Sequence, residues 1–356
     1  LSIAGLDGSD EKGKLEFSTL VEPLIKIMTR PQDNGVKLTS LSIMALVNMC
    51  NQSEEIKDVF LQKHGFQIIM QLLNSKDEDV LVNMLKLVMN LIAKNRSETS
   101  SQIGRTLAEE ENIEYGANAI LKRLIKLVKR GPDIPHCSFS KAVTFMAVGL
   151  LRAFIQHSSA TKALMMTDKA TPGGENFLEA VINKLHPDNI GQIDQEIEGA
   201  ILSLLTQVVS EEIEHTGTVG EHFIKDAGAR LEALLDYMRF KAKQEYGVGR
   251  SRLKKKDLDE LLKQKRISAN VVFTERNEVK FFKFIALLVK TSDENRGRLK
   301  PVLGYVREYR EAVVESSLDK YTRQLESGDR QAAHFVRHYQ ELNKKLKSLE
   351  RLCTDS

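Results

Sequence analysis

The sequence predicts an all-α protein made of stacked helical repeats and finished by a longer helical region at the C-terminus. Apolar residues recur every three to four positions through most of the chain, which is the period of one face of an α-helix. In the stretch 53–95, breaks at Gly65 and at the polar turn 74–77 separate three such patterns. None of the three can bury its apolar stripe alone, so each needs a neighbouring unit stacked against it. A related pattern precedes this stretch, and Asn48 and Asn90 hold equivalent positions 42 residues apart.

Within this stretch we expect three helices, over about 54–63, 66–73 and 79–93. Gly65 permits a sharp corner between the first two, because glycine adopts backbone angles that are closed to other residues. Ser75 or Asp77 is expected to cap the third helix. A wide apolar stripe places that helix in a core. The stripe consists of Leu81, Met84, Leu85, Val88, Leu91 and Ile92.

The same stretch resembles an armadillo repeat. The resemblance is carried by the corner at Gly65, the Leu72–Leu73 pair, the acidic turn 76–79 and the closing sequence Asn90-Leu91-Ile92-Ala93. It implies a right-handed superhelical solenoid of about five armadillo-type repeats over residues 15–300.

In armadillo proteins the last helices of the repeats line a concave groove, where asparagines bind the backbone of an extended peptide. A side-chain amide suits this task because it offers both donors and an acceptor. The resemblance implies a partner-binding role for Asn48 and Asn90. Arg152 and Gln207 stand at the equivalent positions of two later repeats, where they depart from the asparagine of the pattern. Packing between repeats is the alternative role for all four residues.

Outside the repeats, the sequence predicts two distinct ends and one insertion. Residues 1–14, which hold three glycines among charged residues, are expected to form a flexible N-terminal tail. A basic insertion at about 247–270 interrupts the repeats. Residues 301–356 are expected to form longer helices that act as a cap on the last repeat or as a dimerisation region. Both interpretations rest on apolar residues at spacings of three and four over 335–349.

The composition is that of a folded protein in a reducing compartment. The hydrophobic fraction of 42% and the charged fraction of 28% are typical of globular proteins, and no apolar run is long enough for a membrane span. The three cysteines are scattered, which argues against a disulfide framework or a zinc site. The first residues lack the apolar core of a secretion signal. We therefore expect a cytoplasmic protein without a metal or another cofactor.

No arrangement of residues in the sequence supports catalysis, so we expect a scaffold that binds a peptide or helix of a partner protein in the concave groove. One alternative is a GTPase-responsive regulatory domain of a cytoskeletal protein. Formin regulatory regions, which the chain resembles in architecture, also join irregular armadillo repeats to a C-terminal helical dimerisation segment. This alternative implies a small GTPase or cytoskeletal partner, and a homodimer formed through residues 301–356.

A second alternative is a helical repeat that binds nucleic acid, although a net charge of +3 gives it little support. Such a protein would use the basic patch of the insertion, which consists of Arg250, Arg252, Lys254, Lys255 and Lys256.

Overall fold

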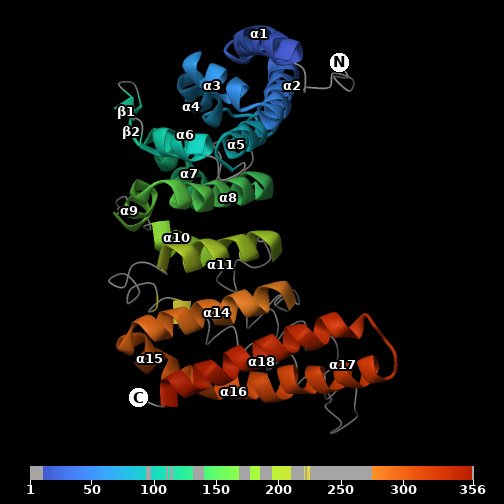
Figure 1. Cartoon of the computed structure of the whole chain (residues 1–356). Helices are drawn as coiled ribbons and strands as arrows, with labels where there is room; N and C mark the ends of the chain where they lie inside the picture. Colours follow the sequence, from blue (N-terminus) through green and yellow to red (C-terminus); the bar gives the residue numbers. More distant parts are fainter. Residues whose placement is uncertain are drawn as a thin grey trace, which may run out of the picture. The chain divides into compact units, whose positions relative to one another are not determined.

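The computed structural model describes residues 11–93, 98–109, 111–112, 115–130, 140–167, 177–184, 195–209, 220, 223–224 and 275–354. Over these residues the chain is an all-α solenoid, in which the only strands are a short antiparallel pair, β1 (Glu111–Asn112) and β2 (Gly116–Ala117) (Figure 1). The chain divides into two compact units, Leu1–Asp168 and Lys169–Ser356. The boundary between them lies inside the region 15–300 where the sequence predicted the repeats.

The first unit contains nine described helices. They are α1 (Glu11–Met28), α2 (Pro31–Gln52), α3 (Glu54–Gln62), α4 (Gly65–Leu73), α5 (Glu78–Ala93), α6 (Glu98–Glu109), α7 (Ala119–Arg130), α8 (Lys141–His157) and α9 (Ser159–Thr167). The long helices α2, α5 and α8 follow one another, and α5 packs against both of the others (Figure 1). Helix α1 begins at Glu11, so residues 11–14, which we expected in the tail, are helical.

The three helices predicted for the stretch 53–95 are present as α3, α4 and α5. The predicted apolar stripe of α5 is confirmed as core, since each of its six residues is at most 1% exposed. At the N-terminus of α5, the Asp77 carboxylate accepts a hydrogen bond from the backbone N–H of Val80 at 3.0 Å. Of the two capping residues considered from the sequence, Asp77 therefore caps the helix, and the Ser75 hydroxyl accepts from the Asp77 N–H.

Gly65 makes the corner between α3 and α4 for a steric reason. The preceding residue, His64, is in the left-handed region with φ 66°, and the chain turns sharply there. A Cβ atom on Gly65 would lie 2.8 Å from the carbonyl oxygen of Phe60 and 3.0 Å from its ring. Only glycine therefore lets α4 start so close to the end of α3.

The second unit contains a short helix, two longer ones and a C-terminal group. They are α10 (Phe177–Lys184), α11 (Gln195–Val209), α14 (Glu275–Thr291), α15 (Asp293–Leu299), the 3-10 turn η2 (Lys300–Val302), α16 (Leu303–Tyr309), the π-helical turn η3 (Arg310–Glu315), α17 (Ser316–Glu326) and α18 (Ala332–Thr354). Helix α14 packs against α11 and α18, and its buried phenylalanines are part of the core. Phe282, which is fully buried, lies 5.5 Å from the ring of Tyr309 and 5.3 Å from that of Phe281.

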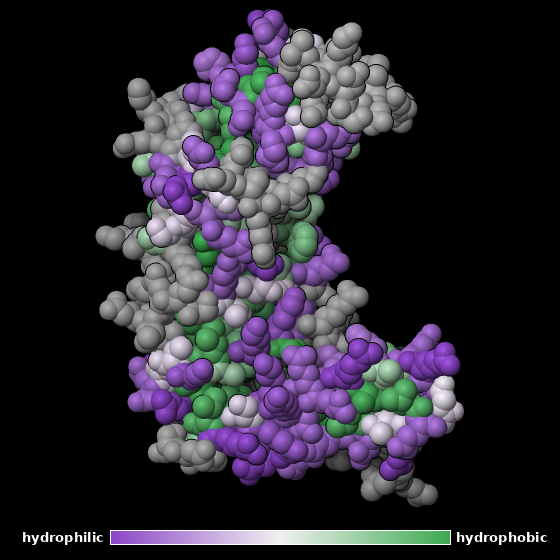
Figure 2. Space-filling model, viewed as in Figure 1, coloured by the Kyte–Doolittle hydropathy of each residue, from purple (hydrophilic) through white to green (hydrophobic). Residues whose placement is uncertain are grey.

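Helices α17 and α18 form a hairpin at the C-terminus. The apolar residues predicted along α18 face its neighbours within the unit: Tyr339, Leu342, Leu346 and Leu349 are buried, and Phe335 is half-buried. Tyr321 of α17 stacks on Phe335 and Tyr339. Helix α17 itself has no buried residue, and Figure 2 shows an apolar patch near the end of the hairpin, where Leu325 is 37% exposed.

Candidate protein-binding face of the first unit

Each of the helices α2, α5 and α8 keeps one stripe of side chains at least partly exposed. Residues spaced by three and four lie on one side of a helix, so each stripe follows its helix lengthwise. The stripes consist of Leu41, Met44 and Asn48 on α2; Val82, Lys86 and Met89 on α5; and Phe145, Gly149 and Arg152 on α8. We call these nine residues the open face.

Contacts on both sides of the exposed stripe of α5 show that it lies between the stripes of α2 and α8. Towards α2, the Asn83 side chain donates to the Ser40 hydroxyl at 2.7 Å, and the Asn90 side chain donates to the carbonyl oxygen of Val47 at 3.3 Å. Towards α8, Met89 approaches Gly149 so closely that a Cβ there would lie 3.3 Å from the Met89 methyl carbon. Lys86 therefore lies at the middle of the α5 stripe, between the two contacts.

Large apolar side chains are exposed on this face. Leu41 is 54% exposed, Met44 46% and Phe145 40%. Among the described residues, six large apolar side chains are at least 40% exposed, and five of them belong to α2 or α8. Single exposed apolar residues are ordinary, but several on the two helices that flank α5 are typical of an interaction surface.

The polar groups of the open face are two cations and one side-chain amide. Lys86 is exposed, and Asn48 is exposed without a hydrogen bond to any described residue. The Nε atom of Arg152 is buried and has no hydrogen-bond partner among the described residues. Leaving a buried donor unpaired costs free energy, which an incoming carboxylate or carbonyl oxygen would recover. The nine residues include no acid, so the face is suited to an acceptor-rich ligand.

The structure places three of the four predicted binding residues on successive helices of one unit. Asn48 belongs to the exposed stripe of α2, whereas Asn90 sits beside the α5 stripe with its amide bonded to α2. Arg152 is half-buried on α8. Gln207 is half-buried on α11 of the second unit and therefore lies outside the open face. The basic patch, 250–256, lies outside the described residues.

Sequence reasoning did not single out Leu41, Met44, Lys86 and Phe145 as surface residues. Leu41 and Met44 continue an apolar pattern at helical spacing, and that pattern looks the same whether the residues face a core or solvent. Their exposure is decided by which side of α2 meets α5. The bonds at Ser40 and Val47 mark that side.

The described residues give little support for a metal site or a reactive cysteine. No group of three or more histidine, cysteine or acidic side chains that could hold a metal occurs among them. Burial raises the pKa of the Cys50 thiol to about 12, so this buried side chain stays protonated and unreactive in the folded state. Across the part of the chain that is described, no helix is both long and apolar enough to cross a membrane.

Asn48 and Asn90 can be distinguished by their effect on stability. We expect Asn90→Ala to lower the free energy of unfolding by about 0.5–1.5 kcal/mol, because it removes the hydrogen bond to Val47. Asn48→Ala, at an exposed position, is expected to change it by less than about 0.5 kcal/mol. Urea unfolding of the two variants followed by circular dichroism measures the difference. Equal midpoints would show that the bond to Val47 adds no stability.

Comparison with known proteins finds no family model that matches the chain. Two curated proteins are similar to part of it. They are the proteins named MAP3K epsilon protein kinase 1 of Brassica napus, 30% identical over 168 residues, and of Arabidopsis thaliana, 29% identical over 168 residues. The match covers 47% of this chain and 11% and 10% of the two kinases, so the matched segment spans about a tenth of their length.

Two solved structures are similar in arrangement. An engineered protein from a structural genomics consortium has a TM-score of 0.47 at 12% identity, covering 92% of this chain and 97% of its own. A designed armadillo repeat protein has a TM-score of 0.45 at 14% identity, covering 94% and 100%. The repeat itself is evident in the chain's own helices, because α3, α4 and α5 form a three-helix unit and α5 stacks between α2 and α8. Over the described residues the chain is therefore an all-α solenoid of stacked helices.

Proposed function

We propose that the first unit is a non-catalytic scaffold that binds a segment of another protein along the open face. The observation that carries this proposal is the exposure of Leu41, Met44 and Phe145 on α2 and α8, the two long helices that flank α5 in one solenoid unit. Contact with a partner would remove their apolar surface from water, which yields about 25 cal/mol for each Å² buried. A stack of helices also offers an extended surface, which suits a peptide or a helix.

The chemistry of the open face defines the class of partner. Apolar side chains of the partner would pack on Leu41, Met44 and Phe145. Carboxylate or backbone carbonyl oxygens would accept hydrogen bonds from Asn48, Lys86 and Arg152. The partner is therefore a segment that combines apolar side chains with acidic ones.

The similarity to part of two protein kinases supports a place for such a scaffold in a larger signalling protein. The matched segment is about a tenth of either kinase, so the kinase activity in their names is not proposed for this chain. In this proposal, the scaffold recruits the partner while other parts of a longer protein act on it.

Charge introduced into the apolar part of the open face tests the proposal. Peptides are first selected from a random displayed library on the wild-type chain, and their affinities are then measured by fluorescence anisotropy. We expect the double variant Met44→Glu/Phe145→Glu to weaken binding at least about tenfold, since each buried side chain contributes about 1.5–3 kcal/mol. The selected peptides are expected to be rich in apolar and acidic residues.

The matched control is Leu20→Glu/Leu325→Glu, which changes two other exposed apolar residues, 45% and 37% exposed, outside the open face. This control is expected to bind the peptides as the wild type does. Thermal unfolding of both double variants checks that they fold. Peptides that bind both double variants equally well would place the binding surface elsewhere and contradict the proposal.

A further inference from the structure

Helix α18 has two faces of opposite character. One face is apolar and packs within the second unit, as described above. On the other face, five residues are all exposed and are spaced by three, four, three and four: Arg337, Gln340, Lys344, Lys347 and Arg351. We call these five residues the cationic seam. The seam holds four cations, and the exposed Glu341 lies beside it.

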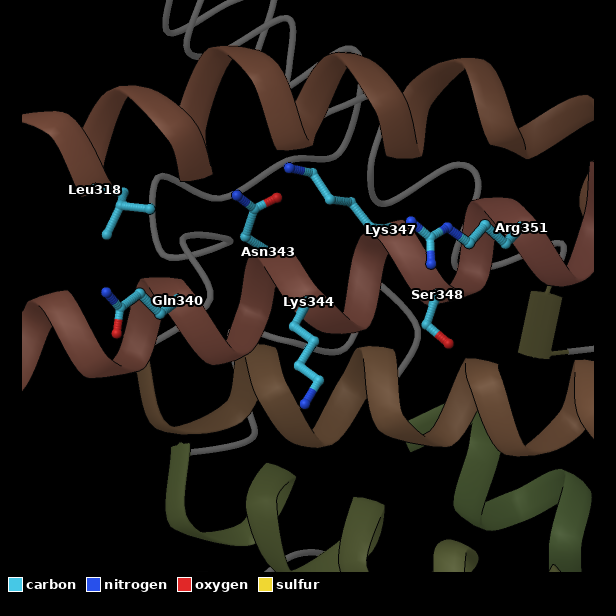
Figure 3. A pocket seen from close by; sticks show the side chains of 7 residues that line it. All are labelled: Leu318, Gln340, Asn343, Lys344, Lys347, Ser348 and Arg351. Atoms are coloured by element: carbon cyan, nitrogen blue, oxygen red, sulfur yellow. The ribbon is translucent and has the colours of Figure 1, made fainter.

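The seam borders a groove between α17 and α18. A hollow of about 470 Å³ is lined by Leu318, Gln340, Asn343, Lys344, Lys347, Ser348 and Arg351. Figure 3 shows Asn343 and Lys347 pointing to one side of α18 and Lys344 and Ser348 to the other. The groove therefore offers an apolar wall at Leu318, an amide, a hydroxyl and three cations.

The charges of Arg337, Lys344 and Lys347 are only weakly compensated by the described residues of the unit. The neighbouring carboxylates are occupied by Arg310, which is 12% exposed and donates to Glu350 at 2.8 Å, to Glu315 at 2.5 Å and to Glu311 at 3.1 Å. Lys347 reaches Glu315 at 3.6 Å, a distance too long for a hydrogen bond, and its side chain is 51% exposed. Arg337 and Lys344 make no hydrogen bond or ion pair with any described residue.

A polar atom in the groove is also unsatisfied. The Asn343 Oδ1 atom is buried and has no hydrogen-bond partner among the described residues. A buried amide without a partner is costly, and its two ends can exchange by rotation of the side chain. An incoming chain with polar groups at this point would satisfy it.

We propose that the cationic seam binds an acidic helix of a partner protein, laid along α18. Spacings of three and four are those at which two helices meet side by side, so carboxylates at the same spacings on a partner helix would face the four cations. From Arg337 to Arg351 the seam is about 21 Å long, which corresponds to about four helical turns. Small apolar residues of the partner would pack on Leu318.

The groove is less suited to a nucleic acid. Its lining residues include no aromatic side chain on which a base could stack. The exposed Glu341 and the half-buried Glu315 also lie beside the seam and would repel a phosphate backbone. A protein helix can place its uncharged residues opposite these acids.

The inference concerns a second surface, in a different unit from the open face, and it is tested separately. The probe is a fluorescein-labelled, end-blocked peptide of three heptads, with glutamate at the first and fourth positions of each heptad and alanine elsewhere. Binding to the full chain is followed by fluorescence anisotropy at low ionic strength. We expect saturable binding that weakens with added salt, because the contacts are between exposed charges.

Two control peptides separate helix recognition from charge alone. One has lysine in place of glutamate and is expected not to bind. The other keeps every glutamate but carries a proline in each heptad, which prevents helix formation. It is expected to bind at least about tenfold more weakly, since its carboxylates no longer match the spacing of the seam.

Two matched variants locate the binding surface. Arg337→Gln/Lys344→Gln removes the two seam cations that lack a partner among the described residues, and we expect it to weaken binding about tenfold. Lys76→Gln/Lys122→Gln removes two exposed charges from the first unit and is expected to bind as the wild type does. The proposal is overturned if the wild type does not bind the acidic peptide, or if both variants bind it equally.

Two further outcomes would also overturn it. Equal affinity for the helical and the proline-containing acidic peptides would show that charge alone, and not the spacing of a helix, accounts for the binding. A single-stranded RNA oligonucleotide that binds more tightly than the acidic peptide, and is lost in Arg337→Gln/Lys344→Gln, would assign the seam to a phosphate backbone. Neither result would bear on the open face, whose test uses other residues and other peptides.

Discussion

Replacing Leu85 with alanine is expected to lower the free energy of unfolding of the first unit by about 2–5 kcal/mol. The Leu85 side chain is fully buried in α5, the helix that packs against α2, α4, α6 and α8. Because so many helices meet around it, the structure cannot collapse fully into the space that the lost methyl groups leave. The cavity therefore adds to the lost transfer free energy.

The reactivity of the Cys50 thiol reports this decrease in the free energy of unfolding of the first unit. Cys50 is 1% exposed in α2, and its raised pKa keeps the thiol unreactive until the unit opens. In a Cys137→Ser/Cys353→Ser background, the rate of reaction with a thiol reagent reports the opening of the first unit. A loss of about 2 kcal/mol raises that rate about thirtyfold.

The matched control is Lys86→Ala, at the exposed neighbouring position of the same helix. It is expected to change the free energy of unfolding by less than about 0.5 kcal/mol. If Leu85→Ala and Lys86→Ala react at the same rate, the apolar stripe of α5 does not hold the unit together.

In the second unit, Phe282→Ala is expected to lower the free energy of unfolding the most, by about 3–5 kcal/mol. Phe282 is fully buried, and its ring packs on Phe281 at 5.3 Å, edge to face, and on Tyr309 at 5.5 Å. Such aromatic pairs stabilise the fold beyond the free energy gained by burying their apolar area. Removing the Phe282 ring therefore removes two ring contacts as well as leaving a cavity.

Cys353, buried in α18 at 3% exposure, reports on this unit in a Cys50→Ser/Cys137→Ser background. Burial raises the pKa of this thiol as well, so the folded unit protects it. A loss of about 3 kcal/mol raises its reaction rate by about a hundredfold. Lys283→Ala, at the exposed adjacent position, is the control and should leave the rate unchanged. A Phe282→Ala rate close to that of the control would show that the aromatic group contributes little to stability.

The repeat could be predicted from the sequence because its signals are local. Apolar residues at helical spacing and the breaks at Gly65 and 74–77 predicted three helices. The observed α3, α4 and α5 each differ from the predicted range by one residue at one end. Local signals also mark the start of α2, because Pro31 suits the first position of a helix and Gly35, with φ 76°, forms a non-helical kink inside α2.

The binding face was harder to predict, because it depends on contacts between residues far apart in the chain. Asn48 and Asn90 have similar sequence surroundings, yet one is exposed and the other bonds to Val47 on the neighbouring helix. The donor and its acceptor are more than forty residues apart, and no local pattern specifies which side of α5 meets α2. Whether either residue contacts a partner stays a prediction.

The π-helical turn η3 has a consequence for the helix that runs through it. The first apolar set is Val302, Val306 and Tyr309 before the turn and Val313 within it, and the second is Val314 within the turn and Leu318, Tyr321 and Leu325 after it. Both sets repeat with the same spacing but are out of phase by one residue. A regular α-helix would rotate the second set by about 100° relative to the first. Because the π-helical turn η3 holds one extra residue, it cancels this rotation. Both apolar sets therefore face α18, which packs against α16, η3 and α17.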